Sequence, residues 1–263
     1  MINVVVITQK DNFFIPRNIE KIIKNNSRDT NLIGVSVIES KGALNSKKIY
    51  FLKGFGITQS VKYAVLLTLQ VLKDLVDNIF FYKFFNGTKS IKSICSKNNV
   101  EYLKIMNPNS KQYIEYLKSN NVDLVISFSA PIIFKENLLK APKYGCVNLH
   151  CSMLPKYSGL MPSFWTLYKN EEFTGVSIHY MDSKIDNGKL LSQEIIEIPK
   201  HISIFNLISL TKNKGGELMC KTIKEICHGN HIVKPNKQDE KYYYSWPTIK
   251  QMNEFTKNGQ KFI

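Results

Sequence analysis

Short apolar runs alternate with longer segments of helical pattern over the first 150 residues, and this alternation constrains the fold more than any other feature. The runs are bounded by polar or turn-forming residues, as buried strands are, and lie at Ile2–Ile7, Leu32–Ile38, Glu101–Ile105, Asp123–Phe128 and Cys146–His150. Helical patterns fill the intervals, at Arg17–Asn26, Ile91–Asn98, Gln112–Asn120 and Ile132–Leu139. Because strands that alternate with helices form a parallel sheet with helices on its faces, the sequence predicts an α/β fold with a Rossmann-like, mostly parallel sheet.

The last of these strands carries two polar side chains at its carboxyl end. Asn148 and His150 are two positions apart, so on a strand they point to the same side. In a parallel sheet, residues at the carboxyl ends of strands face the crevice where ligands bind. An amide donor beside an imidazole suits a carbonyl oxygen that becomes an oxyanion. Because an Asn-x-His pair at a strand end is common, the pair alone does not establish a catalytic site.

A carboxylate follows at a distance that makes the pair more informative. The alternating pattern Thr174–His179 predicts another strand, and a polar loop after it contains Asp186 and ends at Gly188. A carboxylate in such a loop can orient an imidazole and stabilise its proton, as acid–base sites require.

These positions belong to a longer ordered motif: Asn148, His150, Ser152, Leu154, Pro155, Gly159, Pro162, Trp165, Thr174-Gly175-Val176, Asp186 and Gly188. The motif resembles the 10-formyltetrahydrofolate-dependent formyltransferase family, and the resemblance runs from about Asp123 to Ile198. It implies the formyltransferase fold, 10-formyltetrahydrofolate as co-substrate, no metal, and catalytic roles for Asn148, His150 and Asp186.

The resemblance also implies which two loops bind the folate. They are the turn after the Asp123–Phe128 strand and the loop before Asp186, and both are expected to act chiefly through backbone groups. The expected folate contacts are Ser129, Ala130, Pro131, Ile132, Leu154, Asp182, Ser183, Lys184 and Ile185. From the residues alone, the first turn is equally consistent with a plain strand-to-helix turn, with Pro131 in the first helical turn.

The acceptor is predicted from branch-specific residues of the same family. The Pro-Ser-Phe-Trp form at 162–165 resembles the amino-sugar branch, and the turn after the first strand lacks the glycines of the purine-pathway members. We therefore expect a nucleotide-linked amino sugar, a precursor of surface polysaccharide such as lipopolysaccharide. The expected acceptor contacts are Lys156, Tyr157, Pro162, Trp165, Tyr243 and Trp246.

Two other activities of the same family stay open. A methionyl-tRNA formyltransferase normally carries Arg where this chain has Ser158, and a separate barrel that residues 199–263 hardly accommodate. A formyltetrahydrofolate hydrolase would use the same catalytic residues with water as the acceptor.

The chain divides, by this interpretation, into a catalytic domain at 1–200 and a C-terminal helix and tail at 201–263 that pack on it. A helix is predicted at Ile202–Cys227, and an aromatic run follows at Tyr242–Pro247. The aromatic rings could stack on a nucleotide base or simply pack on the domain, and the sequence favours neither.

Charge and cysteine content point to the partners and the compartment. The formal charge is +15, from 36 basic and 21 acidic residues, which favours anionic partners such as phosphates or folate carboxylates. Only Arg17 and Arg28 are arginines, so there is little capacity for bidentate base recognition and nucleic-acid binding is not expected. The five cysteines have no metal-type pairing and are expected to be reduced, in the cytoplasm. On a strand Cys151 would point away from His150, which indicates a structural role.

A long apolar segment between the second and third strands is the least familiar part of the chain. Residues 61–85 read as one helix, interrupted by charges such as Lys62, Lys73 and Asp77, so no run is expected to reach the ~18 residues of a membrane span. The segment is expected either to pack in the core or against a second copy of the chain, or to lie in the plane of a membrane.

Overall fold

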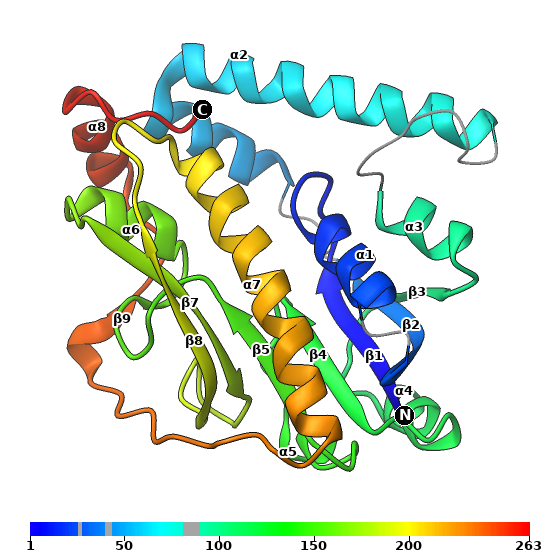
Figure 1. Ribbon diagram of the computed structural model, residues 1–263. Coiled ribbons are helices and arrows are strands. Elements are labelled where there is room, and N and C mark those ends of the chain that lie inside the picture. The colour runs from blue at the N-terminus through cyan, green and yellow to red at the C-terminus, as the bar shows by residue number, and fades with distance from the viewer. Residues whose placement is uncertain (26–27, 40–43, 81–89) are drawn as a thin grey trace.

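A computed structural model describes residues 1–25, 28–39, 44–80 and 90–263, apart from the side chains of residues 44–48. Within these residues, seven strands form one sheet in the order β3-β2-β1-β4-β5-β7-β8 (Figure 1). They are β1 (Ile2–Gln9), β2 (Thr30–Ile38), β3 (Glu101–Ile105), β4 (Leu124–Phe128), β5 (Cys146–His150), β7 (Phe173–Tyr180) and β8 (Leu190–Glu197). The first five pair in parallel, and β7 and β8 are antiparallel. The predicted α/β, mostly parallel architecture is confirmed.

Helices cover both faces of this sheet. The helices of the described residues, not all of which lie on the sheet, are α1 (Ile15–Asn25), α2 (Leu44–Ile79), α3 (Ile91–Lys97), α4 (Lys111–Ser119), α5 (Glu136–Leu139), α6 (Pro162–Tyr168), α7 (Ile204–Cys227) and α8 (Ile249–Lys257). Two short strands, β6 (Ser158–Gly159) and β9 (Tyr243–Tyr244), pair in parallel outside the main sheet, and a 3-10 turn, η1 (Glu240–Tyr242), precedes β9.

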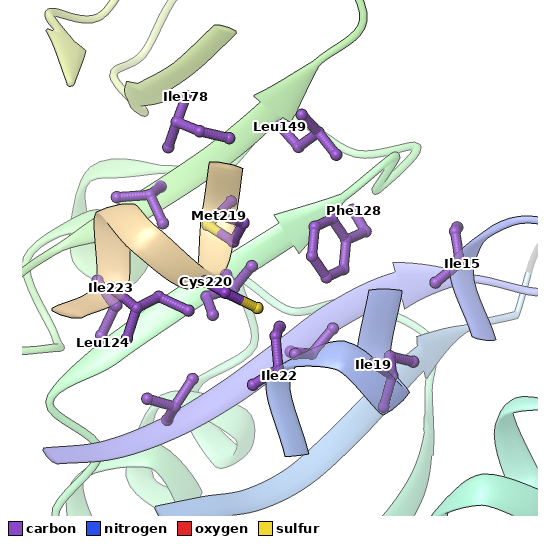
Figure 2. Packing of buried hydrophobic residues seen from close by; sticks show 14 of the residues in the cluster. Ile15, Ile19, Ile22, Leu124, Phe128, Leu149, Ile178, Met219, Cys220 and Ile223 are labelled. Atoms are coloured by element: carbon purple, nitrogen blue, oxygen red, sulfur yellow. The ribbon is translucent and has the colours of Figure 1, made fainter. Parts of the chain in front are cut away.

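Side chains that alternate along each strand divide the core between the two faces of the sheet. Val4 and Val6 of β1 join one buried cluster, while Val5 and Ile7 join the other, as the two-residue period of a strand requires. Figure 2 shows the first cluster, in which side chains of α1 and α7 pack over β4, β5 and β7. The second lies under α4 and α5. Burial on both faces explains why the strands read as nearly continuous apolar runs.

The segment after β4 departs from prediction. A helix was expected over Ile132–Leu139, but α5 begins only at Glu136. Asn109 explains the difference, because its amide nitrogen donates to the carbonyl oxygen of Ile133 (3.0 Å) and its amide oxygen accepts from the Lys135 N–H (2.7 Å). These two bonds use backbone groups of Ile133 and Lys135, and residues 133–135 are not helical.

The long apolar helix also differs from its prediction. It begins at Leu44, well before Val61, and its last described residue is Ile79, so the predicted stretch 81–85 lies outside the described residues. Because of the earlier start, Ile49–Ile79 is long and apolar enough to cross a membrane by length and composition, and the expectation that no such run exists is wrong. Only 6% of its most apolar window is buried, so core packing is wrong for that part of α2.

The C-terminal region folds back over the domain. Ser203 caps α7 by accepting from the Asn206 N–H (3.3 Å), which places the helix start two residues after the predicted one. Sequence reasoning missed β8 and α8, although Thr248 and Gln251 form a capping box that signals the start of α8. The division at residue 200 stays a prediction.

Candidate active site

Asn148 and His150 lie where the alternation of β5 predicts, on the same side of the sheet. Strand β7 pairs antiparallel with β5 and places His179 directly opposite Asn148. The amide nitrogen of Asn148 lies 3.2 Å from His179 Nε2. Two neighbouring strands therefore bring three polar side chains to one point.

Asp186 closes this group from the loop after β7. One carboxylate oxygen lies 3.3 Å from His150 Nδ1, the other lies 3.5 Å from His179 Nε2, and the Gly159 N–H donates to the carboxylate at 2.8 Å. The side chains of His150, His179 and Asp186 are at most 9% exposed. The predicted catalytic residues Asn148, His150 and Asp186 are thus brought together.

The environment of Asp186 favours its ionised form. Burial alone would raise the pKa of this carboxyl group, but the two histidines and the Gly159 N–H outweigh burial and lower the pKa to about 2. The site therefore has a fixed negative charge beside His150 across the neutral pH range.

His150 has a hydrogen-bond acceptor at each ring nitrogen. Nδ1 faces the Asp186 carboxylate, and Nε2 lies 2.8 Å from the carbonyl oxygen of Tyr157. Since both partners accept, the ring satisfies both only when both nitrogens carry protons. The geometry therefore suits an imidazolium that donates.

His179 was missed by sequence reasoning. Its Nδ1 lies 2.7 Å from the carbonyl oxygen of Tyr180, so Nδ1 carries a proton. In the neutral ring, Nε2 accepts from the Asn148 amide, whereas in the charged ring it donates to Asp186. The available signal was a histidine at the end of an alternating strand, immediately before the Asp186 loop.

The backbone of the Asp186 loop is held by a segment 50 residues further along the chain. Asp186 has a left-handed φ of +49°, an uncommon conformation for a residue other than glycine. Its carbonyl oxygen accepts from the side-chain amides of Asn236 and Gln238, both at 2.8 Å, and Asn236 also donates to the Gly188 carbonyl oxygen at 3.1 Å. Sequence reasoning missed both amides.

Glycine is required at position 188 of this loop. A Cβ atom there would lie 1.9 Å from the carbonyl oxygen of Tyr180. The close approach of these two backbone segments fixes where the loop turns back toward β8.

The C-terminal tail also reaches the carboxylate through β6. Strand β9 pairs Tyr244 with Gly159, and the Gly159 N–H is the one that donates to Asp186. The tail therefore supports Asp186 in two ways. Asn236 and Gln238 bind the carbonyl oxygen of Asp186, and Tyr244 pairs with Gly159, whose N–H binds the carboxylate.

The predicted folate contacts fall into two sets. Ser129, Ala130, Pro131 and Ile132 form the turn after β4, and Asp182, Ser183, Lys184 and Ile185 lie on the Asp186 loop with Ser183–Ile185 exposed. Ala130, Ile132 and Met181 pack on the same buried cluster, so the two loops flank one apolar wall beside β5. Leu154 differs, because it is buried and its backbone N–H donates to Ser177 Oγ.

This arrangement fits a flat, partly apolar ring system with a polar edge. Two partly exposed loops flank an apolar wall, and the donors at Asn148 and His150 lie at the carboxyl end of β5. Among the described residues, no cluster of His, Cys, Asp or Glu side chains has the arrangement of a metal site.

The predicted acceptor contacts are divided between surface and interior. Tyr157 donates to Glu171 at 2.6 Å and stacks on Tyr244 at a ring separation of 5.2 Å. Trp165 was expected to contact the acceptor, but it is buried and its indole N–H donates to the Ser245 carbonyl oxygen at 3.0 Å. Lys156 is exposed and Pro162 is the first residue of α6. Tyr243 and Trp246 are 46% and 47% exposed.

The turn after β1 has its own carboxylate. Asp11 accepts from three consecutive backbone N–H groups at the start of α1, those of Phe13, Phe14 and Ile15, at 2.6–3.0 Å. A helix N-terminus is a natural anion site, and here the chain itself occupies it. This agrees with the absence of a glycine-rich phosphate turn in the sequence.

Comparisons with known proteins place these residues in context. A family model described as formyl transferase matches residues 88–223. The methionyl-tRNA formyltransferase of Clostridium perfringens is 34% identical over 155 residues, which cover 59% of this chain and 50% of that protein. The bifunctional polymyxin resistance protein ArnA of Wigglesworthia glossinidia brevipalpis is 42% identical over 130 residues, or 49% of this chain and 19% of that protein. The chain spans about half the length of the first of these relatives and less of the second.

Solved structures share the fold at low sequence identity. An N-formyltransferase from Helicobacter canadensis, solved in complex with folinic acid and dTDP-3-aminofucose, has a TM-score of 0.60 and 18% identity over 97% of this chain and 80% of that one. A glycinamide ribonucleotide transformylase from Symbiobacterium toebii has a TM-score of 0.62 and 14% identity over 90% of this chain and 95% of that one.

Proposed function

The chain belongs to the formyl transferase family, and on that premise we propose that it transfers a formyl group from 10-formyltetrahydrofolate to the primary amine of a nucleotide-linked amino sugar. The observation that carries the proposal is the buried group at the end of β5. His150 lies between the Asp186 carboxylate and the Tyr157 carbonyl oxygen, with the Asn148 amide beside it.

The chain's own residues supply what this reaction needs. The folate provides the formyl carbon, and the acceptor amine forms a new N–C bond to it as the bond from that carbon to folate N10 breaks. Asn148 and His150 donate to the formyl oxygen as it gains negative charge, which is the largest single contribution in acyl transfers of this kind. The formyl oxygen would replace the Tyr157 carbonyl oxygen as the acceptor from His150 Nε2.

Asp186 stabilises the positive charge of His150 and helps to move a proton. The amine must lose a proton for the product to be neutral, and folate N10 must gain one. A carboxylate with a pKa of about 2 is too weak a base to keep that proton at neutral pH. We therefore assign Asp186 an orienting and charge-stabilising role, with the proton passing along it or through water.

A sugar acceptor is supported by three observations. The start of α1 is capped by Asp11 and is unsuited to the phosphate of a purine-pathway substrate. The Pro-Ser-Phe-Trp form at 162–165, which begins α6, resembles the amino-sugar branch. A fold relative was solved with dTDP-3-aminofucose. The proposed location is the cytoplasm, in keeping with five cysteines that are all free thiols.

Methionyl-tRNA is the second candidate acceptor, favoured by the 34% identity to a methionyl-tRNA formyltransferase. One experiment separates the candidates. The protein is incubated with 10-formyltetrahydrofolate alone, with a panel of nucleotide-linked amino sugars, or with charged initiator tRNA, and tetrahydrofolate release is followed. Release that depends on a sugar supports the proposal. Release that depends only on tRNA, or that occurs without any acceptor, contradicts it in favour of the tRNA enzyme or the hydrolase.

A further inference from the structure

The outer part of α2, from Ile57 to Ile79, presents large apolar side chains to solvent. Gly56, with φ +81° and ψ 173°, separates it from the first part of α2. Each of the following side chains is 50–73% exposed: Ile57, Val61, Val65, Leu69, Val71, Leu72, Leu75 and Ile79. A soluble monomer rarely exposes a contiguous apolar patch of more than a few hundred Å².

These side chains form one continuous face. At 3.6 residues per turn they fall, together with Ala64, Thr68 and Val76, within an arc of roughly 160°, along a helix about 33 Å long. No charged residue falls within the arc. Lys62 and Lys73 lie along one edge of it, about three helical turns apart.

The side of the helix that carries Asp74 and Asp77 faces the protein. Asp77 is 1% exposed, Asp74 accepts from the Ser90 N–H at 3.3 Å, and Gln59 accepts from the Ile263 N–H at 3.0 Å. The ring of Tyr63 packs on Phe51 and Phe262, with centroid separations of 5.5 and 5.8 Å. A surface helix of a water-soluble domain has the opposite orientation, with its apolar stripe toward the core.

We propose that this face of α2 docks in the plane of an anionic lipid bilayer, with its apolar side chains in the headgroup–acyl boundary. Helices that lie on membranes combine such a face with basic residues at its border. Lys62 and Lys73 occupy that border, Asp74 and Asp77 are turned away from it, and the formal charge of the chain is +15. Each lysine near an anionic surface adds to the attraction.

The same contacts distinguish docking from two other arrangements. A spanning helix would have to detach Gln59, Tyr63 and Asp74 from the body, although its length and composition would allow it to cross. Two copies paired through this face of α2 would not bring Asp74 or Asp77 to Lys62 and Lys73, because both carboxylates face inward. In-plane docking leaves the inward contacts intact and gives the lysines an anionic partner. Figure 1 shows α2 lying along one edge of the molecule.

The test is flotation of the full chain with vesicles of phosphatidylcholine containing one quarter phosphatidylglycerol, and with vesicles of phosphatidylcholine alone. It requires no catalytic activity, so it stands independently of the proposed function. We expect binding to the anionic vesicles that weakens in high salt. Leu72→Glu should lower the vesicle-bound fraction roughly tenfold or more, since it removes an apolar side chain that docking would bury in the bilayer and adds a repelled charge.

Gln70→Glu is the matched control, because it adds the same charge to the same turn on the inward side. It should bind nearly as wild type. Equal loss of binding in Leu72→Glu and Gln70→Glu, or no flotation of the wild type, would overturn the proposal. A wild-type dimer in solution that Leu72→Glu dissociates, with no vesicle binding by the wild type or the variant, would also overturn it. Protein that stays with the vesicles after washing with carbonate at pH 11 would indicate a spanning helix and would overturn in-plane docking.

Discussion

Replacing Asp186 with Asn should destabilise the protein in a way that depends on pH. The pKa of this carboxyl group lies at about 2 against an ordinary value of 3.8, because the histidines and the Gly159 N–H outweigh the effect of burial. At 1.36 kcal/mol per pKa unit, the ionised carboxylate contributes about 2 kcal/mol to the free energy of unfolding. Since the folded pKa is depressed, this contribution is complete above about pH 4 and is lost as the pH falls through about 2.

Urea denaturation of wild type and Asp186→Asn, followed by circular dichroism at pH 5, 4 and 3, measures this difference. The variant should be less stable by about 2 kcal/mol at pH 5 and by about half of that at pH 3. Glu115→Gln, which removes an exposed carboxylate, should differ from wild type by less than about 0.5 kcal/mol throughout. Equal stability of Asp186→Asn and wild type at pH 5, or a deficit that stays constant down to pH 3, would refute the electrostatic reasoning.

Three further predictions follow from the site. Cys151→Ser should keep turnover within a few-fold of wild type, because the proposed mechanism gives Cys151 no step, and a trapped formyl thioester on Cys151 would contradict this. Gln238→Ala should lower kcat about 10- to 100-fold with little change in KM, because it loosens the loop that carries the Asp186 carboxylate. Lys237→Ala, which changes an exposed neighbouring side chain, is the control. Equal kcat in the two variants would refute the role of Gln238 in supporting the loop. If the exposed rings of Tyr243 and Trp246 stack on the base, Tyr243→Ala and Trp246→Ala should each raise KM for the nucleotide sugar without changing folate affinity. An unchanged KM in both variants would mean that the rings only pack against the protein.

The sequence predicts the parts of this site that depend on local pattern. The side shared by Asn148 and His150 follows from the two-residue period of β5, and the Asp186 loop is recognisable from its polar residues and Gly188. The partner of Asn148 is not local: His179 lies opposite it only because β5 and β7 pair antiparallel in one register.

Other features depend on contacts between distant segments, which no local pattern encodes. Gln238 binds Asp186, 52 positions away in the sequence. Asn109 binds Ile133, 24 positions away, and so prevents an earlier start of α5. For α2, the apolar pattern correctly indicates a helix, but a periodic pattern cannot say which side faces the protein. That orientation is set by contacts such as those of Tyr63 and Gln59 with the C-terminal tail.

We have proposed that Asn148, His150 and Asp186 form the site of formyl transfer to an amine. The most direct measurement follows the ¹³C resonance of 10-formyltetrahydrofolate labelled at the formyl carbon, with a nucleotide-linked amino sugar as acceptor, for wild type and His150→Ala. Wild type should convert the label into a sugar formamide, and His150→Ala should do so about 100- to 1,000-fold more slowly, the usual effect of losing one oxyanion donor. A label that appears as formate, or that His150→Ala transfers at the wild-type rate, would contradict the claim.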